Sequence, residues 1–417
     1  MRPGIHGLLD VAASPERWWA LLLVILLPSV ACSQASPISG QVVSSDAALQ
    51  ETANALLQDI AERSGLSLAG PVRVEWRSKE ELVRYLTFKL DEEFQEGEVE
   101  RIRDSYALLG LVPETLDLGE LFLALYTEQV AGFYDPDSVA LYVRSGQDEE
   151  TVESVLVHEL VHAAQDQFAD LEALTGRARG NDRQIAAQAA AEGHATLVML
   201  EYALEKRQGS EVDLVAIPNF IDLMGPSLAG AASSSPVLST APAIVRESLI
   251  FPYVQGTEYV RVLWQRHPGR PPPFGELLPH STEQVLEPER AFGPDPDAPI
   301  DIEFSGGGAS VTYTNSLGVA EIGILFEEVA GDGRPIRGWE GDRFALVEGS
   351  GGSRGLVWWS VWEDEAARDA FVSRGQAVAA ALTDATLEPG TLDGRPAAVL
   401  TVGAVSALPL ARIVGGA

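Results

Sequence analysis

The amino-acid sequence predicts an α+β fold: a helix-rich domain with a small N-terminal sheet, followed by a small C-terminal α+β domain. Apolar residues recur at helical spacing in several long segments, whereas only short segments alternate as strands do. The proline-rich segment 294–299 marks a boundary, after which helical and strand-like segments alternate. A chain of 417 residues is also long enough for two or three domains. We therefore expect domains at residues 47–293 and 300–417.

Residues 1–31 have the features of a signal peptide. The segment 18–31 is apolar, follows an arginine and is too short to span a bilayer comfortably, although an uncleaved anchor is the alternative. Cys32 is the only cysteine, and the Ser29-Val-Ala before it is similar to a bacterial lipobox in which Ser29 replaces the usual Leu. We therefore expect an exported protein that a lipid on Cys32 anchors to the extracytoplasmic face of the cell membrane. Residues 32–46 are expected to form a flexible tether.

The elements expected before residue 145 combine the small sheet with the helices around it. Ser78, with Glu81 three residues later, is typical of a capping box at the start of a helix. An Asp-Pro-Asp turn precedes the second strand, so a hairpin is expected there. The expected elements are helices over 47–66, 78–94 and 118–130, a turn over 132–138, and strands over 72–76 and 139–143.

The segment 156–168 contains His158, Glu159 and His162 in the spacing H-E-x-x-H. Residues four apart lie on the same face of a helix, so both imidazoles can reach one Zn²⁺ ion while the glutamate between them reaches its bound water. Apolar flanking residues at helical spacing predict a buried amphipathic helix rather than a solvated loop. The alternative is a chance pattern on a helix surface.

A third metal ligand is expected from a second helix over 185–200. Glu192 lies there among Ala, Val, Leu and Met residues, where an ionised carboxylate needs a cation or hydrogen-bond donors. His194 competes with it, but it lies two positions away on roughly the opposite face, so at most one of the two binds the metal. We favour Glu192. Asp166, one turn beyond His162, either orients a ligand or is a solvated carboxylate near the helix end.

These motifs resemble the gluzincin type of zinc metalloprotease, in which H-E-x-x-H is followed by Glu-Gly-x-Ala on a second helix. The runs V-H-E-L-V-H-A-A-Q-D-Q-F and A-E-G-H-A-T are more closely similar to uncharacterised exported bacterial metalloprotease lipoproteins, and the similarity covers about residues 70–375. The resemblance implies a zincin-like domain in which His158, His162 and Glu192 bind Zn²⁺ and Glu159 is the general base.

The same resemblance implies two further features. The hairpin before the metal-binding helix resembles the edge strand along which gluzincins align a peptide, with an inner strand as the alternative. A downstream Tyr or His commonly stabilises the oxyanion in gluzincins. Tyr253 is the candidate because it lies at the expected start of a helix that ends near His267; Tyr259, His267 and His280 are its rivals, and Tyr253 is otherwise an ordinary packed tyrosine.

Two segments near the expected site lack a regular pattern. Residues 174–181 are expected to form a loop between the two site helices. Residues 225–243, rich in Gly, Ala, Ser and Pro, are expected to be a surface loop, with a mobile flap over the cleft as the alternative.

In the C-terminal domain we expect an antiparallel sheet with helices on one face. Its tryptophans are expected to pack in the core rather than to bind a ligand. The expected elements are helices over 317–330 and 364–382 and strands over 338–344 and 355–362.

The net charge of −32 argues against nucleic acid and against anionic membrane surfaces as direct partners, and solubility explains the larger share of it. Together, these features predict zinc-dependent hydrolysis of a peptide bond in an extracytoplasmic protein or peptide. The alternative is a non-catalytic, zinc-stabilised envelope lipoprotein that acts as a binding or assembly factor. A third reading is a zinc amidase that acts on cell-wall peptide.

Overall fold

The computed structural model describes residues 41–414, apart from short gaps at 219, 233–234, 294–295, 306–309, 349–351, 404 and 406–407. The expected signal peptide, Cys32 and most of the expected tether lie outside the described residues. The described end of that tether is ordered, because Val42 and Val43 form a strand and Asp46 caps the first helix. None of the helices that the structure describes is long and apolar enough to cross a membrane.

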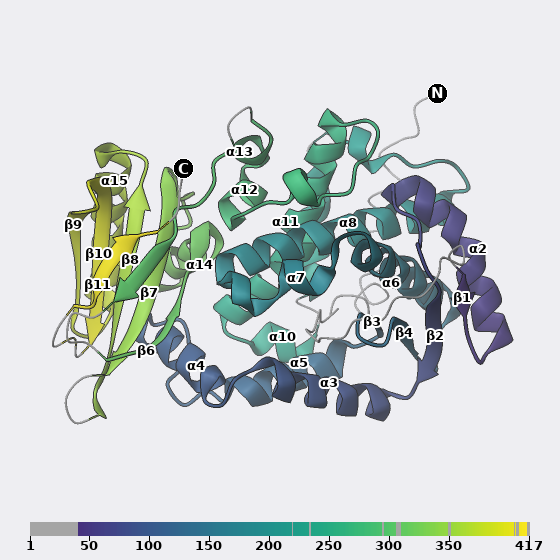
Figure 1. The fold of residues 1–417 in the computed structure, drawn as a ribbon, viewed down its shortest axis with the longest axis horizontal. Helices are drawn as coiled ribbons and strands as arrows, with labels where there is room; N and C mark the ends of the chain where they lie inside the picture. The colour runs from purple at the N-terminus through teal and green to yellow at the C-terminus, as the bar shows by residue number, and fades with distance from the viewer. Residues whose placement is uncertain are drawn as a thin grey trace.

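The fold is α+β, as predicted, with a sheet at each end of the molecule and helices between them (Figure 1). The four-stranded N-terminal sheet has the order β1-β2-β4-β3, so β3 is an edge strand. β2 is parallel to β1 and β4, and β3 is antiparallel to β4. These strands are β1 (Val42–Val43), β2 (Val72–Arg77), β3 (Gly132–Asp135) and β4 (Ala140–Arg144).

Most predicted helices are present with nearly the predicted bounds. Ser78 and Glu81 form the predicted capping box. The α-helices before the C-terminal region are α2 (Ala47–Ser64), α3 (Lys79–Glu93), α4 (Glu98–Leu108), α5 (Leu118–Gln129), α6 (Glu149–Ala169), α7 (Leu171–Thr175), α8 (Asn181–Gln208), α9 (Phe220–Ala232), α10 (Pro236–Thr240), α11 (Ala243–Arg266), α12 (Thr282–Leu286) and α13 (Pro288–Phe292). Short 3₁₀ helices are η3 (Arg177–Arg179), η4 (Leu214–Ala216) and η5 (Gly275–Leu277).

Three segments differ from the prediction. The turn expected over 132–138 is shorter, because Gly132–Asp135 is strand β3. The loop expected over 174–181 contains the end of α7, the helix η3 and the start of α8. The surface loop expected over 225–243 is mostly helical, because α9 and α10 occupy it. Phe220 and Met224, four residues apart in α9, are buried in the core, and this packing favours a helix despite the Gly- and Pro-containing composition.

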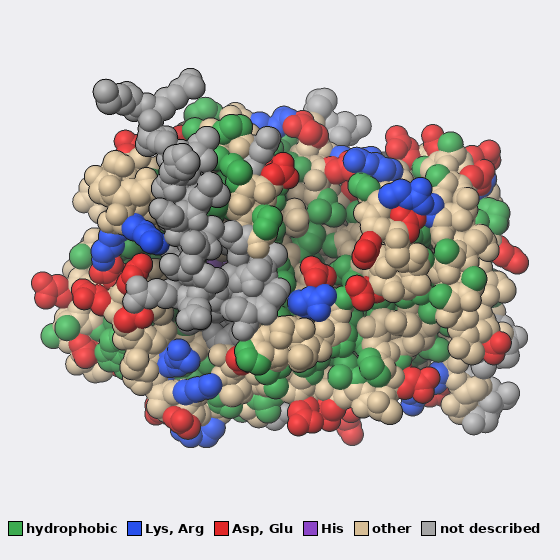
Figure 2. All heavy atoms as spheres, turned by 180° about the vertical axis from the view of Figure 1, so that it is seen from behind, with side chains coloured by type: hydrophobic (Ala, Val, Ile, Leu, Met, Phe, Trp, Pro, Cys, Tyr) green, Lys and Arg blue, Asp and Glu red, His purple; other side chains and the backbone are tan. Residues whose placement is uncertain are grey.

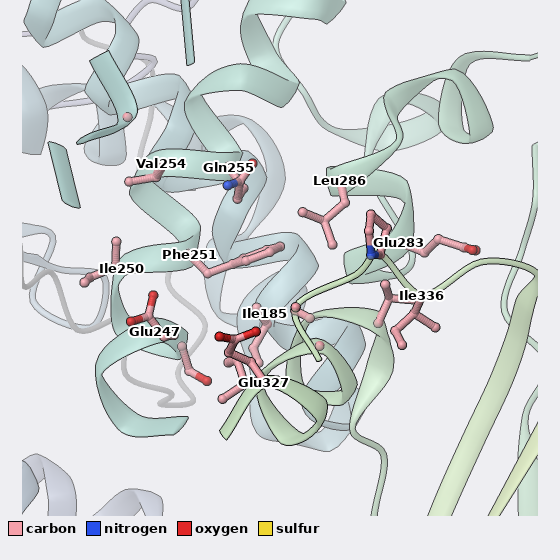
Figure 3. A pocket seen from close by; sticks show the side chains of 18 of the residues that line it. Ile185, Glu247, Ile250, Phe251, Val254, Gln255, Glu283, Leu286, Glu327 and Ile336 are labelled. Carbon is pink, nitrogen blue, oxygen red and sulfur yellow. The ribbon is translucent and has the colours of Figure 1, made fainter. Parts of the chain in front are cut away.

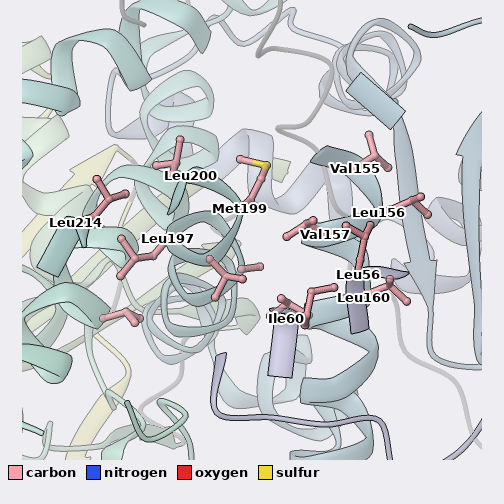
Figure 4. Close-up of a cluster of buried hydrophobic side chains, with 14 of the residues drawn as sticks. Leu56, Ile60, Val155, Leu156, Val157, Leu160, Leu197, Met199, Leu200 and Leu214 are labelled. Atoms are coloured by element: carbon pink, nitrogen blue, oxygen red, sulfur yellow. The ribbon is translucent and has the colours of Figure 1, made fainter. Parts of the chain in front are cut away.

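The main core cluster joins the N-terminal sheet to α2, α6 and α8 (Figure 4). Its apolar side chains recur three and four residues apart in each helix, so each helix turns one stripe toward the others. Figure 4 shows members from all three helices: Leu56 and Ile60 of α2, Leu156 and Leu160 of α6, and Leu197 and Leu200 of α8. This packing fixes α6 against α8, the two helices that carry the predicted metal ligands.

The C-terminal region is an antiparallel sheet with the order β6-β7-β8-β10-β9. Both of its helices pack against that sheet, as predicted, and they also pack against each other (Figure 1). Trp339, Trp358 and Trp362 are buried in its core, which confirms the expected packing role. The elements are β5 (Ile302–Ser305), β6 (Ser310–Asn315), α14 (Gly318–Ala330), β7 (Trp339–Glu348), β8 (Arg354–Trp362), α15 (Glu365–Ala381), β9 (Ala385–Leu392), β10 (Arg395–Gly403) and β11 (Leu410–Ile413).

One core cluster crosses the predicted boundary between the two domains. It contains Leu109 and Leu125 from the N-terminal half and Ile244 from α11, together with Phe326 and Trp358 from the C-terminal region. The C-terminal sheet is therefore packed firmly against the helical part rather than tethered to it.

Candidate metal centre

Helix α6 carries the H-E-x-x-H segment and packs between α8, α2 and the N-terminal sheet. Its N-terminus is capped by Asp148, whose side chain accepts a hydrogen bond from Thr151 N. Packing on both sides then buries His158, Glu159 and His162, whose exposed fractions are 1%, 2% and 0%. Three polar side chains without solvent need partners inside the protein.

The structure brings His158, His162 and Glu192 together. Glu192 Oε2 lies 3.2 Å from His158 Nε2 and 3.3 Å from His162 Nε2, and the two Nε2 atoms are 3.0 Å apart. One possible ligand atom from each residue lies within 4.8 Å of the other two. Within the described residues, this is the group whose donors can hold one metal ion, and two imidazoles with one carboxylate are a donor set that Zn²⁺ takes.

A chain of hydrogen bonds fixes the proton positions of this cluster. His194 Nε2 donates to Ser64 O at 3.0 Å, so His194 Nδ1 is the acceptor for Gln165 Nε2, also at 3.0 Å. The Gln165 amide is thereby oriented so that its Oε1 accepts from His162 Nδ1 at 2.8 Å. Since Nδ1 holds a proton, Nε2 is the nitrogen of His162 that can bind a metal.

This chain gives roles to two residues, His194 and Asp166, for which the sequence left alternatives open. His194 does not join the cluster; it orients Gln165. Asp166 was considered as the residue that orients a ligand, but it accepts hydrogen bonds from Tyr134 Oη and Leu171 N instead. Gln165, the residue before it, makes the contact with His162, and only the folded arrangement of α6, α8 and Ser64 reveals this role.

The charges of the cluster favour a cation. Burial opposes ionisation of Glu192, but the charge of His162 and the hydrogen bonds from both imidazoles hold its pKa at about 2. Burial also opposes protonation of His162, yet Glu192 raises the pKa of His162 to about 9. Burial lowers the pKa of His158. The ionised Glu192 is thus balanced by one positive charge between the imidazoles, where a metal ion can replace the proton.

Glu159 lies beside the cluster and is tied to the edge strand β3. Its Oε2 accepts a hydrogen bond from Tyr134 N at 2.9 Å. Burial raises the pKa of Glu159 to about 8, because the charge of His162 and the Tyr134 N–H only partly offset the loss of water. The hairpin was expected to contain either an edge strand or an inner strand of the sheet. It contains both, because β3 is an edge strand and β4 is an inner strand.

Tyr253 lies in the middle of α11 and not at a helix start, as the sequence suggested, because α11 begins at Ala243. Its ring centroid is 6.5 Å from that of His158, and it is 6% exposed. A close approach of α8 and α11 places it there. A Cβ on Gly193 would lie 2.1 Å from Gly256 O, so only glycine allows this contact, and the Gly that follows Glu192 has a packing role.

The rivals of Tyr253 lie elsewhere. Tyr259 is fully buried and donates its hydroxyl hydrogen bond to Leu277 O at 2.7 Å. His267 follows the last residue of α11. Partial burial of the ring, together with the charges of Arg179 and Arg183, lowers the pKa of His280. Among these four candidates, Tyr253 is the one whose ring contacts a residue of the His158–His162–Glu192 group.

A large hollow lies beside α11 (Figure 3). It has a volume of about 900 Å³, is lined by α9, α11, α12 and α14, and includes neither imidazole of the cluster. Phe251 and Leu286 give it an apolar wall, while Glu247 and Glu327 add carboxylates (Figure 3). Acidic side chains are dispersed over the face in Figure 2 rather than gathered at one site.

The family described as "Domain of unknown function (DUF8575)" matches residues 309–401. This stretch spans most of the C-terminal sheet together with α14 and α15. No curated protein and no solved structure matches the chain. The family match therefore covers the C-terminal region and does not include His158, His162 or Glu192. The function of these three residues is inferred from their geometry.

Proposed function

We propose that this protein is a zinc-dependent peptidase that acts outside the cytoplasmic membrane, with His158, His162 and Glu192 as the metal ligands. One observation carries the proposal: three buried donors from α6 and α8 lie within 4.8 Å of one another. The hydrogen-bond chain through Gln165 supports it, because it leaves His162 Nε2 as the metal-binding nitrogen.

Bound Zn²⁺ supplies Lewis-acid chemistry, since it acidifies water and polarises a carbonyl group. Glu159 is the proposed general base. Tyr134 N–H holds its Oε2, and Oε1 is the oxygen that takes the proton from water and returns it to the leaving amine. Tyr253, next to His158, is the proposed donor to the oxyanion.

The position of β3 supports a peptide as the substrate. Ala131 O accepts a hydrogen bond from Arg144 N across the hairpin, so the backbone groups of Gly132 and Tyr134 face away from β4. Tyr134 N already reaches Glu159 in this direction. A substrate paired along this edge would have its backbone next to the general base, whatever its side chains are.

The test is the substitution Glu159→Gln, with Glu149→Gln as the control at an exposed position in the same helix. Glu159→Gln should keep bound zinc but lower the rate of peptide cleavage by about 10²- to 10⁴-fold, whereas Glu149→Gln should leave both unchanged. Zinc is measured by elemental analysis, and cleavage by mass spectrometry of a digested peptide library with and without chelator.

Two outcomes would contradict the proposal. Unchanged cleavage in Glu159→Gln would exclude this residue as the base. No cleavage of any peptide by the wild-type protein with one zinc ion bound would instead favour a non-catalytic envelope protein stabilised by the metal. Cleavage of peptidoglycan fragments alone would redirect the proposal to a cell-wall amidase.

A further inference from the structure

A second pocket, lined mainly by polar side chains, lies where the start of α8 meets the C-terminal sheet. Its volume is about 330 Å³. It is separate from the metal cluster, because Arg183 and Glu192 are nine residues apart in α8, roughly 13 Å along the helix axis. Residues from α4, η3, α8, β6 and β7 line it, and its charged lining residues are Arg177, Arg179, Arg183, Arg343, Glu98 and Asp301.

The charges of this pocket do not balance. Glu98 pairs with Arg177 at 2.8 Å, and Asp301 pairs with Arg183 at 3.2 Å. Arg179 and Arg343 form no ion pair with any carboxylate that the structure describes, and Arg343 donates to the neutral Thr314 hydroxyl at 3.0 Å. The pocket thus concentrates positive charge in a chain whose net charge is −32.

Some of its hydrogen-bond donors are buried without an acceptor. Arg177 Nε and Arg179 Nε are buried and have no acceptor among the described residues. A buried unpaired donor costs about 1–3 kcal/mol, more when it is charged. Burial and the neighbouring charge of Arg183 also lower the pKa of Arg179, so its charge is not compensated locally.

The start of α8 adds to the positive potential. This helix is 28 residues long, and its N-cap is Gly180, which has no side chain. The Asn181 N–H in the first turn donates to Asn315 Oδ1 at 2.9 Å, which is an uncharged acceptor. Asp182 in that turn points away, since its carboxylate accepts hydrogen bonds from Thr282. The positive end of the helix dipole therefore lies beside the arginines.

We propose that this pocket is a binding site for an oxyanion, either a free ion or the anionic group of a small organic molecule. Guanidinium groups pair with phosphate, sulfate and carboxylate through parallel N–H donors. The anion accepts hydrogen bonds from Arg179 and neutralises Arg343. Because it contacts η3 and α8 on one side and β7 on the other, its binding stabilises the junction with the C-terminal region. The site is independent of the proposed peptidase activity.

Isothermal titration of the full zinc-loaded protein with inorganic phosphate, at constant ionic strength set with chloride, tests the site. The variants are Arg179→Gln and, as the matched control, Arg207→Gln, an exposed arginine at the other end of α8. We expect saturable binding by wild type and by Arg207→Gln, and affinity about ten- to a hundredfold lower in Arg179→Gln. Heat signals no greater than those from chloride, or equal affinities in the two variants, would overturn the proposal.

Two further variants keep the test decisive if Arg179→Gln does not fold. Arg179→Lys keeps the charge but loses the paired donors, so phosphate should bind more weakly than to wild type. Arg343→Gln removes charge from the opposite wall and should also weaken binding. Titrations with sulfate and succinate distinguish the two kinds of anion. Tighter binding of phosphate or sulfate indicates a tetrahedral anion, and tighter binding of succinate indicates a carboxylate. Wild-type affinity in both variants would refute the site.

Discussion

Two of the buried carboxylates of helix α8 behave in opposite ways. Glu192 and Asp182 have the same exposed fraction of 3%. Glu192 faces two imidazoles, and its pKa is about 2 despite burial. Asp182 faces the backbone N–H and hydroxyl of Thr282, which are neutral, and burial raises its pKa to about 7. The charge of the partner, rather than the depth of burial, decides which carboxylate stays ionised and can serve as a metal ligand.

Substituting each carboxylate by its amide is the strongest test of this difference. Glu192→Gln removes the charge that completes the donor set, so zinc affinity should fall by at least about a hundredfold. Asp182→Asn should bind zinc like wild type, because its partner is Thr282. A competitive titration against a chromophoric chelator measures both affinities.

The comparison fails if the two variants lose zinc to the same extent, since Asp182 would then act on the metal site through the fold. Circular dichroism spectra of both variants show whether any loss reflects unfolding.

The contact beside Glu192 is the next test. Gly193→Ala places a methyl group against Gly256, and the overpacking should destabilise the protein by about 1–3 kcal/mol. It should also slow cleavage, because a displaced α11 moves Tyr253 from His158. Gly323→Ala is the control: a Cβ there meets nothing within 4 Å, and alanine favours the helix α14. Urea unfolding gives the free energies; equal stability of Gly193→Ala and wild type would show that the two helices can separate without cost.

The parts of the site that the sequence predicted are local. The spacing of His158 and His162 determines their shared helix face, and the apolar surroundings of Glu192 mark it as a buried acid that needs a cation. The contacts that orient these groups are not local: Gln165 becomes important because it contacts His194, and His194 in turn contacts Ser64, which is far away in the chain. The arginine pocket likewise combines residues from five separate elements.

The errors of prediction have a related cause. Composition favoured a loop over residues 225–243, but burial of Phe220 and Met224 against the core stabilises α9. Tyr253 was expected at a helix start, whereas α11 begins at Ala243 and continues through Pro252. Packing energy outweighed local preference in both segments.

Gln165→Leu tests the orienting residue. It removes the acceptor for His162 Nδ1 and the donor to His194, so zinc affinity should fall by about ten- to a hundredfold, less than in Glu192→Gln. Gln167→Leu is the control in the same helix, because its amide hydrogen-bonds Ala69 and Gly70 instead. Equal zinc affinities in the two leucine variants would mean that the hydrogen-bond chain does not tune the metal site.

The most gradual expected effect is a pH dependence that belongs to Asp182. Its pKa of about 7 in the folded protein exceeds the value of roughly 3.9 expected in the unfolded chain, so between these values the folded state binds more protons. The contribution of Asp182 to stability is therefore complete below the lower value and is lost as the pH rises through 7, by up to about 1.4 kcal/mol per pH unit. Asp182→Asn removes this slope. Urea unfolding from pH 5 to 8 should show the stability of wild type falling relative to the variant. A constant difference would mean that Asp182 is ionised like Glu192. The charge of the imidazoles would then not explain why Glu192 stays ionised.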